Sequence, residues 1–186
     1  MPAPVLLLDV DGVVQAPGLR HEWPDARPVT VRLKGDVYPR TGGSFPITVS
    51  NKLFQAVEAL GVQVWWATSW SDEGAIHGLI EQTGLTSVAP RLAASRVLSH
   101  PPRNVWEGYL PDHWKVTGMI RPVLEAEPRP FILADDIFAG HTYRQMLSWY
   151  VDDELPRLFI QPDPRRGLTR AHLVQMANWL GDQGRE

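Results

Sequence analysis

The chain has no cysteine among its 186 residues. That absence excludes a disulfide framework, a thiolate zinc site and a thiol nucleophile, and it favours a cytoplasmic location. Strong charge of one sign is also missing, because the formal net charge is only -3. The molecule as a whole therefore gives no electrostatic sign of a nucleic-acid or membrane partner.

Long hydrophobic runs are missing near the start of the chain. The apolar segment that begins at Val5 is interrupted by Asp9, so we expect neither a signal peptide nor a membrane helix. With 44% hydrophobic and 21% charged residues, the composition is that of an ordinary globular protein. A chain of this length can form one domain, residues 1–186, that buries about 70% of its unfolded surface.

Short apolar runs alternate with helical patterns along the chain. Such alternation is typical of a parallel sheet covered by helices on both faces, so we expect an α/β fold of three layers with a mostly parallel five-stranded sheet. The predicted strands cover residues 5–10, 62–67, 86–89, 131–134 and 158–161. The predicted helices cover residues 50–60, 71–84, 112–127, 142–152 and the segment after 169, with a loop at 90–112.

Several helix boundaries carry their own sequence signals. Ser50 and Thr169 precede helical patterns and are predicted N-caps. Gly61 follows the first helical pattern, where a glycine ends a helix readily. Ser71 is predicted to cap the helix that Gly84 ends.

Residues 17–49 separate the first predicted strand from the first predicted helix. Apolar and polar residues alternate at 29–34 and again at 45–49, which predicts a β-hairpin that forms a small flap. Contact with a polyanion would explain a basic insert, and a solvated hairpin face would explain it equally well. The local charge of +2 comes from Arg20, Arg27, Arg32, Lys34 and Arg40 against Glu22, Asp25 and Asp36.

Polar residues follow three of the predicted strands. In an open parallel sheet the carboxyl ends of the strands meet at one edge, where ligands bind. Turn and capping roles would explain any one of these residues, but their repetition favours a common site. They are Asp9, Asp11 and Gly12 at the end of the first strand, Thr68 and Ser69 after the second, and Asp135 and Asp136 after the fourth.

Lys115 occupies an unusual position for a cation. It falls in the first turn of the helix predicted at 112–127, where a positive charge opposes the helix dipole by a few tenths of a kcal/mol. Departures from local rules tend to mark functional positions. A solvated surface lysine is the alternative interpretation.

Four motifs, in order, resemble those of the haloacid dehalogenase (HAD) superfamily. They are DVDGV with Asp9 and Asp11, ATS with Thr68, WK with Lys115, and ADD with Asp135 and Asp136. More narrowly, DVDGV, VWWATSW and HWK are similar to the HAD-type domain of Swiss Army Knife RNA-repair proteins. The resemblance implies a Rossmann-like HAD core and a phosphatase that forms an aspartyl-phosphate with the help of Mg²⁺.

The resemblance also implies catalytic roles. Asp9 would be the nucleophile, and Asp11 would protonate the leaving oxygen and then activate water. Thr68 and Lys115 would hold the phosphoryl group that is transferred.

The implied metal and substrate contacts involve further positions. Mg²⁺ would be held by Asp9, by the backbone carbonyl of Asp11 and by the pair Asp135 and Asp136. Within that pair, Asp136 is expected to ligate the metal directly and Asp135 to orient Lys115. The expected substrate-binding residues are Gly12, Ser69, Arg32 and Lys34.

Other functions use the same fold. Haloacid dehalogenation is disfavoured, because a leaving halide needs no acid at Asp11. A phosphotransferase or phosphomutase acting on small metabolites stays open, as does a non-catalytic phosphate-binding module. For a phosphatase, the expected substrate is a nucleotide or a nucleic-acid end, with no membrane and no obligate protein partner.

Overall fold

The structure is a computed structural model that describes residues 2–32, 43–70, 75–99, 113–151 and 154–184. At its centre lies a parallel sheet of five strands in the order β5-β4-β1-β6-β7, which confirms the predicted α/β fold. The central strand β1 pairs with β4 and β6, so that Leu8 lies opposite Trp66 and Ala134. The strands are β1 (Val5–Leu8), β4 (Gln63–Trp66), β5 (Arg96–Val97), β6 (Phe131–Ala134) and β7 (Arg157–Ile160).

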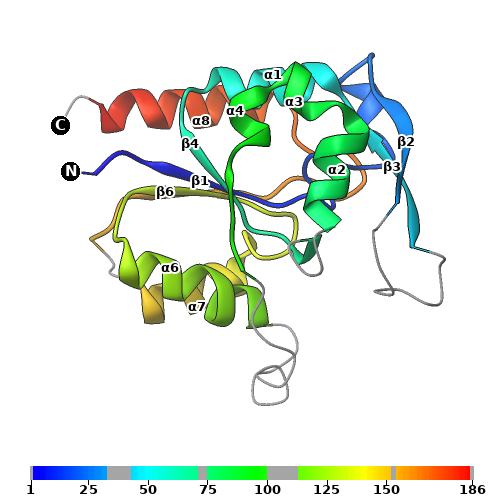
Figure 1. Ribbon diagram of the computed structural model, residues 1–186. Helices are drawn as coiled ribbons and strands as arrows, with labels where there is room; N and C mark the ends of the chain where they lie inside the picture. Colours follow the sequence, from blue (N-terminus) through cyan, green and yellow to red (C-terminus); the bar gives the residue numbers. More distant parts are fainter. Residues whose placement is uncertain (1, 33–42, 71–74, 100–112, 152–153, 185–186) are drawn as a thin grey trace.

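Helices cover both faces of the sheet (Figure 1). Because side chains alternate along a strand, Leu6 and Leu8 belong to one buried cluster while Val5 and Leu7 belong to the other. None of the helices that the structure describes is long and apolar enough to cross a membrane. The first cluster includes side chains of α1 (Asn51–Ala59), α2 (Ala75–Thr83), α3 (Leu85–Val88), α4 (Pro90–Ala93) and α8 (Arg170–Gln183), and the second those of the π-helix η4 (Lys115–Ile120), α6 (Arg121–Ala126) and α7 (His141–Tyr150).

A short 3-10 turn, η1 (Leu19–His21), and then an antiparallel hairpin follow β1. The hairpin confirms the prediction made for residues 17–49. Its strands β2 (Arg27–Arg32) and β3 (Ser44–Val49) bury Val31, Ile47 and Val49 in the first cluster. Helix α2 packs beside β2, and Gln82 bonds to both backbone groups of Arg32. The described part of the hairpin is therefore anchored to the main body of the fold (Figure 1).

Helix boundaries agree with their sequence signals at several places. The Ser50 hydroxyl accepts the Leu53 N–H at 3.1 Å and caps α1. Gly61 has φ of 69°, a left-handed conformation that suits the end of a helix. Thr169 caps α8 in a reciprocal pair with His172. The predicted cap Ser71 lies outside the described residues.

The predicted strand at 86–89 is wrong, because Leu85–Val88 forms α3. A short apolar run with β-branched residues fits a strand or a buried helical turn, and periodicity alone cannot separate them. The edge strand is instead β5 (Arg96–Val97), which lies with α4 inside the segment predicted as loop.

The predicted α-helix at 112–127 has a different form in its first half. Residues Lys115–Ile120 form a π-helix, and the regular α-helix covers only Arg121–Ala126. A π-helix has a wider turn than an α-helix and has no simple sequence signature. Asp112, the expected start, lies outside the described residues.

Candidate active site

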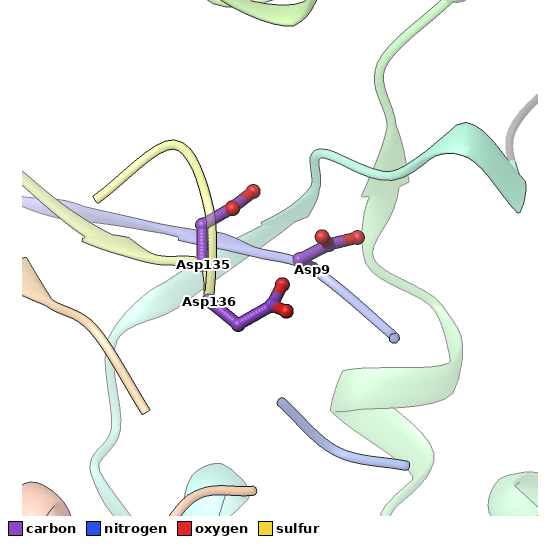
Figure 2. Close-up of side chains that lie close together, drawn as sticks. All are labelled: Asp9, Asp135 and Asp136. Carbon is purple, nitrogen blue, oxygen red and sulfur yellow. The ribbon is translucent and has the colours of Figure 1, made fainter. Parts of the chain in front are cut away.

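The pairing of β1 with β6 brings two acidic segments to one edge of the sheet. Leu8 lies opposite Ala134, so the next residues of the two strands, Asp9 and Asp135, leave the sheet side by side. The Asp9 N–H donates to the Ala134 carbonyl at 3.0 Å and extends the pairing by one step. Figure 2 shows Asp9, Asp135 and Asp136 close together at these strand ends.

Lys115, from the π-helix η4, links the two strand ends. Its Nζ atom lies 2.7 Å from Oδ2 of Asp9 and 2.6 Å from Oδ2 of Asp135. All three side chains are almost fully buried. Lys115 begins the π-helix η4, so its predicted place at a helix start agrees with the structure.

Asp135 and Asp136 have different surroundings. Asp135 uses Oδ2 for Lys115, and its Oδ1 accepts the backbone N–H groups of Ile137 at 2.9 Å and Phe138 at 2.5 Å. Asp136 is half-buried, and its backbone carbonyl accepts a bond from Gln161 at 3.0 Å. Asp135 is thus committed to protein donors, whereas Asp136 is partly accessible to solvent.

One carboxylate oxygen from each of Asp9, Asp135 and Asp136 lies within 4.8 Å of the others. Burial raises the pKa of Asp9 to about 7 against the attraction of Lys115. Burial and the charge of Asp135 raise the pKa of Asp136 to about 6. Burial also disfavours the charged ammonium of Lys115, but Asp9 and Asp135 together outweigh it and raise its pKa. Three carboxylates and one ammonium group lie together here, and a divalent ion would offset the excess negative charge of the ionised cluster.

Gly12 lets the loop after β1 approach Asp136. Its φ is 65°, and a Cβ built there would lie 2.5 Å from the carboxylate of Asp136. A side chain at this position would therefore have to displace the acidic residue. Glycine is required by the backbone conformation and by the space.

Asp11 lies on the same loop, and its side chain is exposed. Its Oδ1 accepts the side-chain amide of Gln15 at 3.0 Å, and its Oδ2 accepts the indole N–H of Trp70 at 2.8 Å. Both oxygens of this second aspartate are therefore bound by neutral donors.

Thr68 and Ser69 follow β4, the other neighbour of β1. Thr68 is fully buried, and its hydroxyl accepts the backbone N–H of Trp70 at 3.2 Å. Ser69 is exposed at the same edge. The predicted residues of three strand ends thus meet at one edge of the sheet.

Two of the predicted substrate-binding residues, Arg32 and Lys34, belong to the insert after β1 and not to the strand ends. Arg32 is exposed at the end of β2, where its backbone is held by Gln82. It belongs to the hairpin and not to the carboxylate cluster. Lys34 lies outside the described residues.

A sequence model of the family described as "HAD domain in Swiss Army Knife RNA repair proteins" matches residues 5–173. The chain belongs to this family. Searches of curated proteins and of solved structures found no match. The matched segment contains every described residue of the site.

Membership in this HAD family assigns the chain to a superfamily of phosphatase-like hydrolases. The acidic cluster of Asp9, Asp135 and Asp136 is compatible with that chemistry. HAD domains generally use Mg²⁺, and the cluster offers the oxygen ligands that this ion prefers.

Gln15 and Gln161 could not be identified from the sequence, although they bond to Asp11 and to the Asp136 backbone in this HAD domain. A glutamine in a loop carries no pattern that would mark it. For Trp70, the available signal in the sequence is its place two residues after Thr68.

Proposed function

We propose that the protein is a Mg²⁺-dependent phosphatase that hydrolyses phosphate monoesters through an aspartyl-phosphate on Asp9. The observation that carries this proposal is the buried contact of Lys115 with both Asp9 and Asp135 at the ends of adjacent strands. A buried cation between two carboxylates is costly to build. Its location where α/β sheets bind ligands favours a catalytic role.

The residues present fit a magnesium ion. The cluster supplies only carboxylate oxygens, which are hard ligands. Asp136 is favoured as the direct ligand with Asp9, because Asp135 already serves Lys115 and two backbone N–H groups. When bound, the ion would offset the charge of the phosphate and polarise its oxygens.

Each catalytic residue of the chain would then have its own role in the reaction. A carboxylate oxygen of Asp9 attacks phosphorus, and the bond from phosphorus to the ester oxygen breaks with its electron pair on that oxygen. Asp11 gives the leaving oxygen a proton and then takes one from the water that attacks phosphorus in the aspartyl-phosphate. The bond from phosphorus to Asp9 then breaks, which releases phosphate and returns the Asp9 carboxylate. Lys115 and Thr68 hold the phosphoryl oxygens. Phosphoryl transfer needs positioning and charge neutralisation above all.

For the substrate, we propose a nucleotide or a nucleic-acid end carrying a phosphate. The basic hairpin insert supports a polyanionic substrate. Arg165 and Arg166 are exposed in the loop after β7 and add positive charge there. The family is described by its occurrence in RNA repair proteins, which agrees with this choice.

Replacing the proposed nucleophile tests the mechanism. We expect Asp9→Asn to abolish phosphate release while the protein stays folded, because asparagine keeps the shape but is a poor nucleophile. Phosphate release is measured with and without Mg²⁺, and circular dichroism checks the fold. A variant that keeps a tenth of the wild-type rate would contradict the assignment.

The substrate class is tested with the wild-type protein. Phosphate release is compared for nucleotides, sugar phosphates, phosphoproteins and oligonucleotides with 3′ or 5′ phosphates. A clear preference for sugar phosphates would contradict the nucleic-acid proposal.

A further inference from the structure

The second aspartate of the loop after β1 is bound from two sides. Gln15 donates to Oδ1 of Asp11 at 3.0 Å, and the indole of Trp70 donates to Oδ2 at 2.8 Å. An exposed carboxylate with no partner samples several rotamers. Two donors on different oxygens select one orientation, and each oxygen still has a lone pair for another partner.

Trp70 is itself held in place by two parts of the fold. Its ring packs at 54° against the ring of Phe45 in β3, with the ring centres 6.3 Å apart. Its backbone N–H donates to the hydroxyl of Thr68 at 3.2 Å. The indole is half-buried and packs against the first hydrophobic cluster. The hairpin and the end of β4 therefore fix the direction of the indole N–H.

We propose that Trp70 is a positioning residue for proton transfer, because its indole N–H and the amide of Gln15 together orient the Asp11 carboxyl toward the leaving oxygen. This inference rests on the proposed phosphatase function. Trp70 itself touches neither the substrate nor the reacting atoms in this role.

The chemistry of the indole suits this task. Its N–H donates a hydrogen bond but neither accepts one nor titrates. It can therefore fix the direction of the Asp11 carboxyl without itself exchanging a proton.

The test compares two aryl esters that differ mainly in their leaving groups. Phenyl phosphate needs a proton on its departing oxygen, whereas p-nitrophenyl phosphate releases a stable anion. The value of kcat/KM reports the first chemical step for each ester. A misplaced acid should therefore slow phenyl phosphate selectively.

Trp70→Phe removes the N–H and keeps a ring against Phe45. We expect kcat/KM for phenyl phosphate to fall by about 10- to 100-fold, the effect of a small misplacement of a catalytic group. For p-nitrophenyl phosphate we expect a fall of about twofold or less, since its leaving group gains little from acid catalysis. An equal loss for both esters, or no loss, would overturn the inference.

Trp23→Phe is the matched control. The Trp23 indole donates to the Leu168 carbonyl at 2.8 Å, so this substitution also removes one indole hydrogen bond, from a residue that is 4% exposed. We expect its ratio of the two kcat/KM values to equal that of the wild type. A changed ratio would mean that loss of any such bond perturbs the site, which also overturns the inference.

Asp11→Asn separates this inference from the proposed function. If Asp11→Asn slows phenyl phosphate selectively but Trp70→Phe does not, the positioning role is wrong and the function stands. If the wild type releases no phosphate from either ester, or if Asp11→Asn changes nothing, the proposed chemistry fails and the inference fails with it.

A second variant covers the case in which Trp70→Phe does not fold. Gln15→Met removes the other donor to Asp11 from a half-buried side chain of similar length. We expect the same selective loss for phenyl phosphate, about tenfold. If Gln15→Met changes kcat/KM by the same factor for both esters, the inference is overturned.

Discussion

At the scale of single residues, the site is organised around one ammonium group. Lys115 contacts Asp9 and Asp135 at 2.7 and 2.6 Å in surroundings that exclude most water. Removing one partner from a buried ionic group leaves the others without compensation. Lys115 is therefore expected to support the fold as well as the phosphoryl group.

Lys115→Met tests this structural contribution. Methionine fills similar space but leaves Asp9 and Asp135 buried without a cation, so we expect the free energy of unfolding at pH 8 to fall by about 3–5 kcal/mol. The loss should be smaller at pH 5, because burial raises the pKa of Asp9 to about 7 and its carboxyl can take up a proton there. Urea unfolding in the presence of a chelator measures it.

Lys52→Met is the control for that measurement. Lys52 is exposed on α1, and a substitution there should change the free energy of unfolding by about 0.5 kcal/mol or less. If Lys115→Met costs no more than Lys52→Met, the ammonium does not hold the carboxylates together.

At the scale of elements, the hairpin is held against the main body of the fold by α2. Helix α2 completes its outer edge, because Gln82 accepts the Arg32 N–H at 2.9 Å and donates to the Arg32 carbonyl at 2.8 Å. A side-chain amide thus replaces a neighbouring strand at that residue. Such pairing satisfies an edge that would otherwise be open.

Gln82→Ala should loosen this edge without unfolding the protein. We expect the free energy of unfolding to fall by about 1 kcal/mol or less, since both bonds are near solvent. The backbone N–H of Arg32 should exchange faster with deuterium, as measured by NMR. Gln55→Ala, at an exposed position of α1, is the control. Equal exchange at Arg32 in the two variants would contradict the anchoring role.

Elements differed in how well the sequence predicted them. Caps are local, so Ser50 and Thr169 could be identified from neighbouring residues. Helix α3 could not, because its four residues fit two conformations and only packing decides between them. The π-helix η4 was missed because a π-helix has no simple sequence signature.

At the scale of the whole molecule, the meeting of the strand ends at one edge of the sheet was the predictable part of the site. Continuous apolar runs ended at Asp9 and Asp135, and a parallel sheet brings such ends to one edge. The bond from Trp70 to Asp11 joins residues 59 positions apart. No local pattern indicates a pairing of that kind, so it required the folded structure.

Metal binding should be visible in the stability of the entire protein. Asp9 and Asp136 have pKa values raised to about 7 and about 6 from 3.8. Between pH 4 and 7 the folded chain thus keeps protons that the unfolded chain has lost. These groups make the metal-free protein less stable as the pH rises through that range. Mg²⁺ should reverse this loss by replacing the protons.

Thermal unfolding at pH 5 and pH 8 provides the measurement. We expect Mg²⁺ to raise Tm more at pH 8 than at pH 5, because protons compete with the ion at the lower pH. Asp136→Asn is expected to weaken the effect of Mg²⁺ at pH 8. If Mg²⁺ shifts Tm equally for this variant and the wild type, Asp136 does not hold the ion.

The wide turn of η4 makes the site sensitive to chain length as well as to side chains. A π-helix amounts to an extra residue within an α-helix, and each residue of an α-helix rotates the chain by about 100°. In-frame loss of one codon, such as that of Gly118, would let Lys115–Ile120 rewind and carry the lysine away from both aspartates. The shortened protein would keep every catalytic residue and would still be inactive.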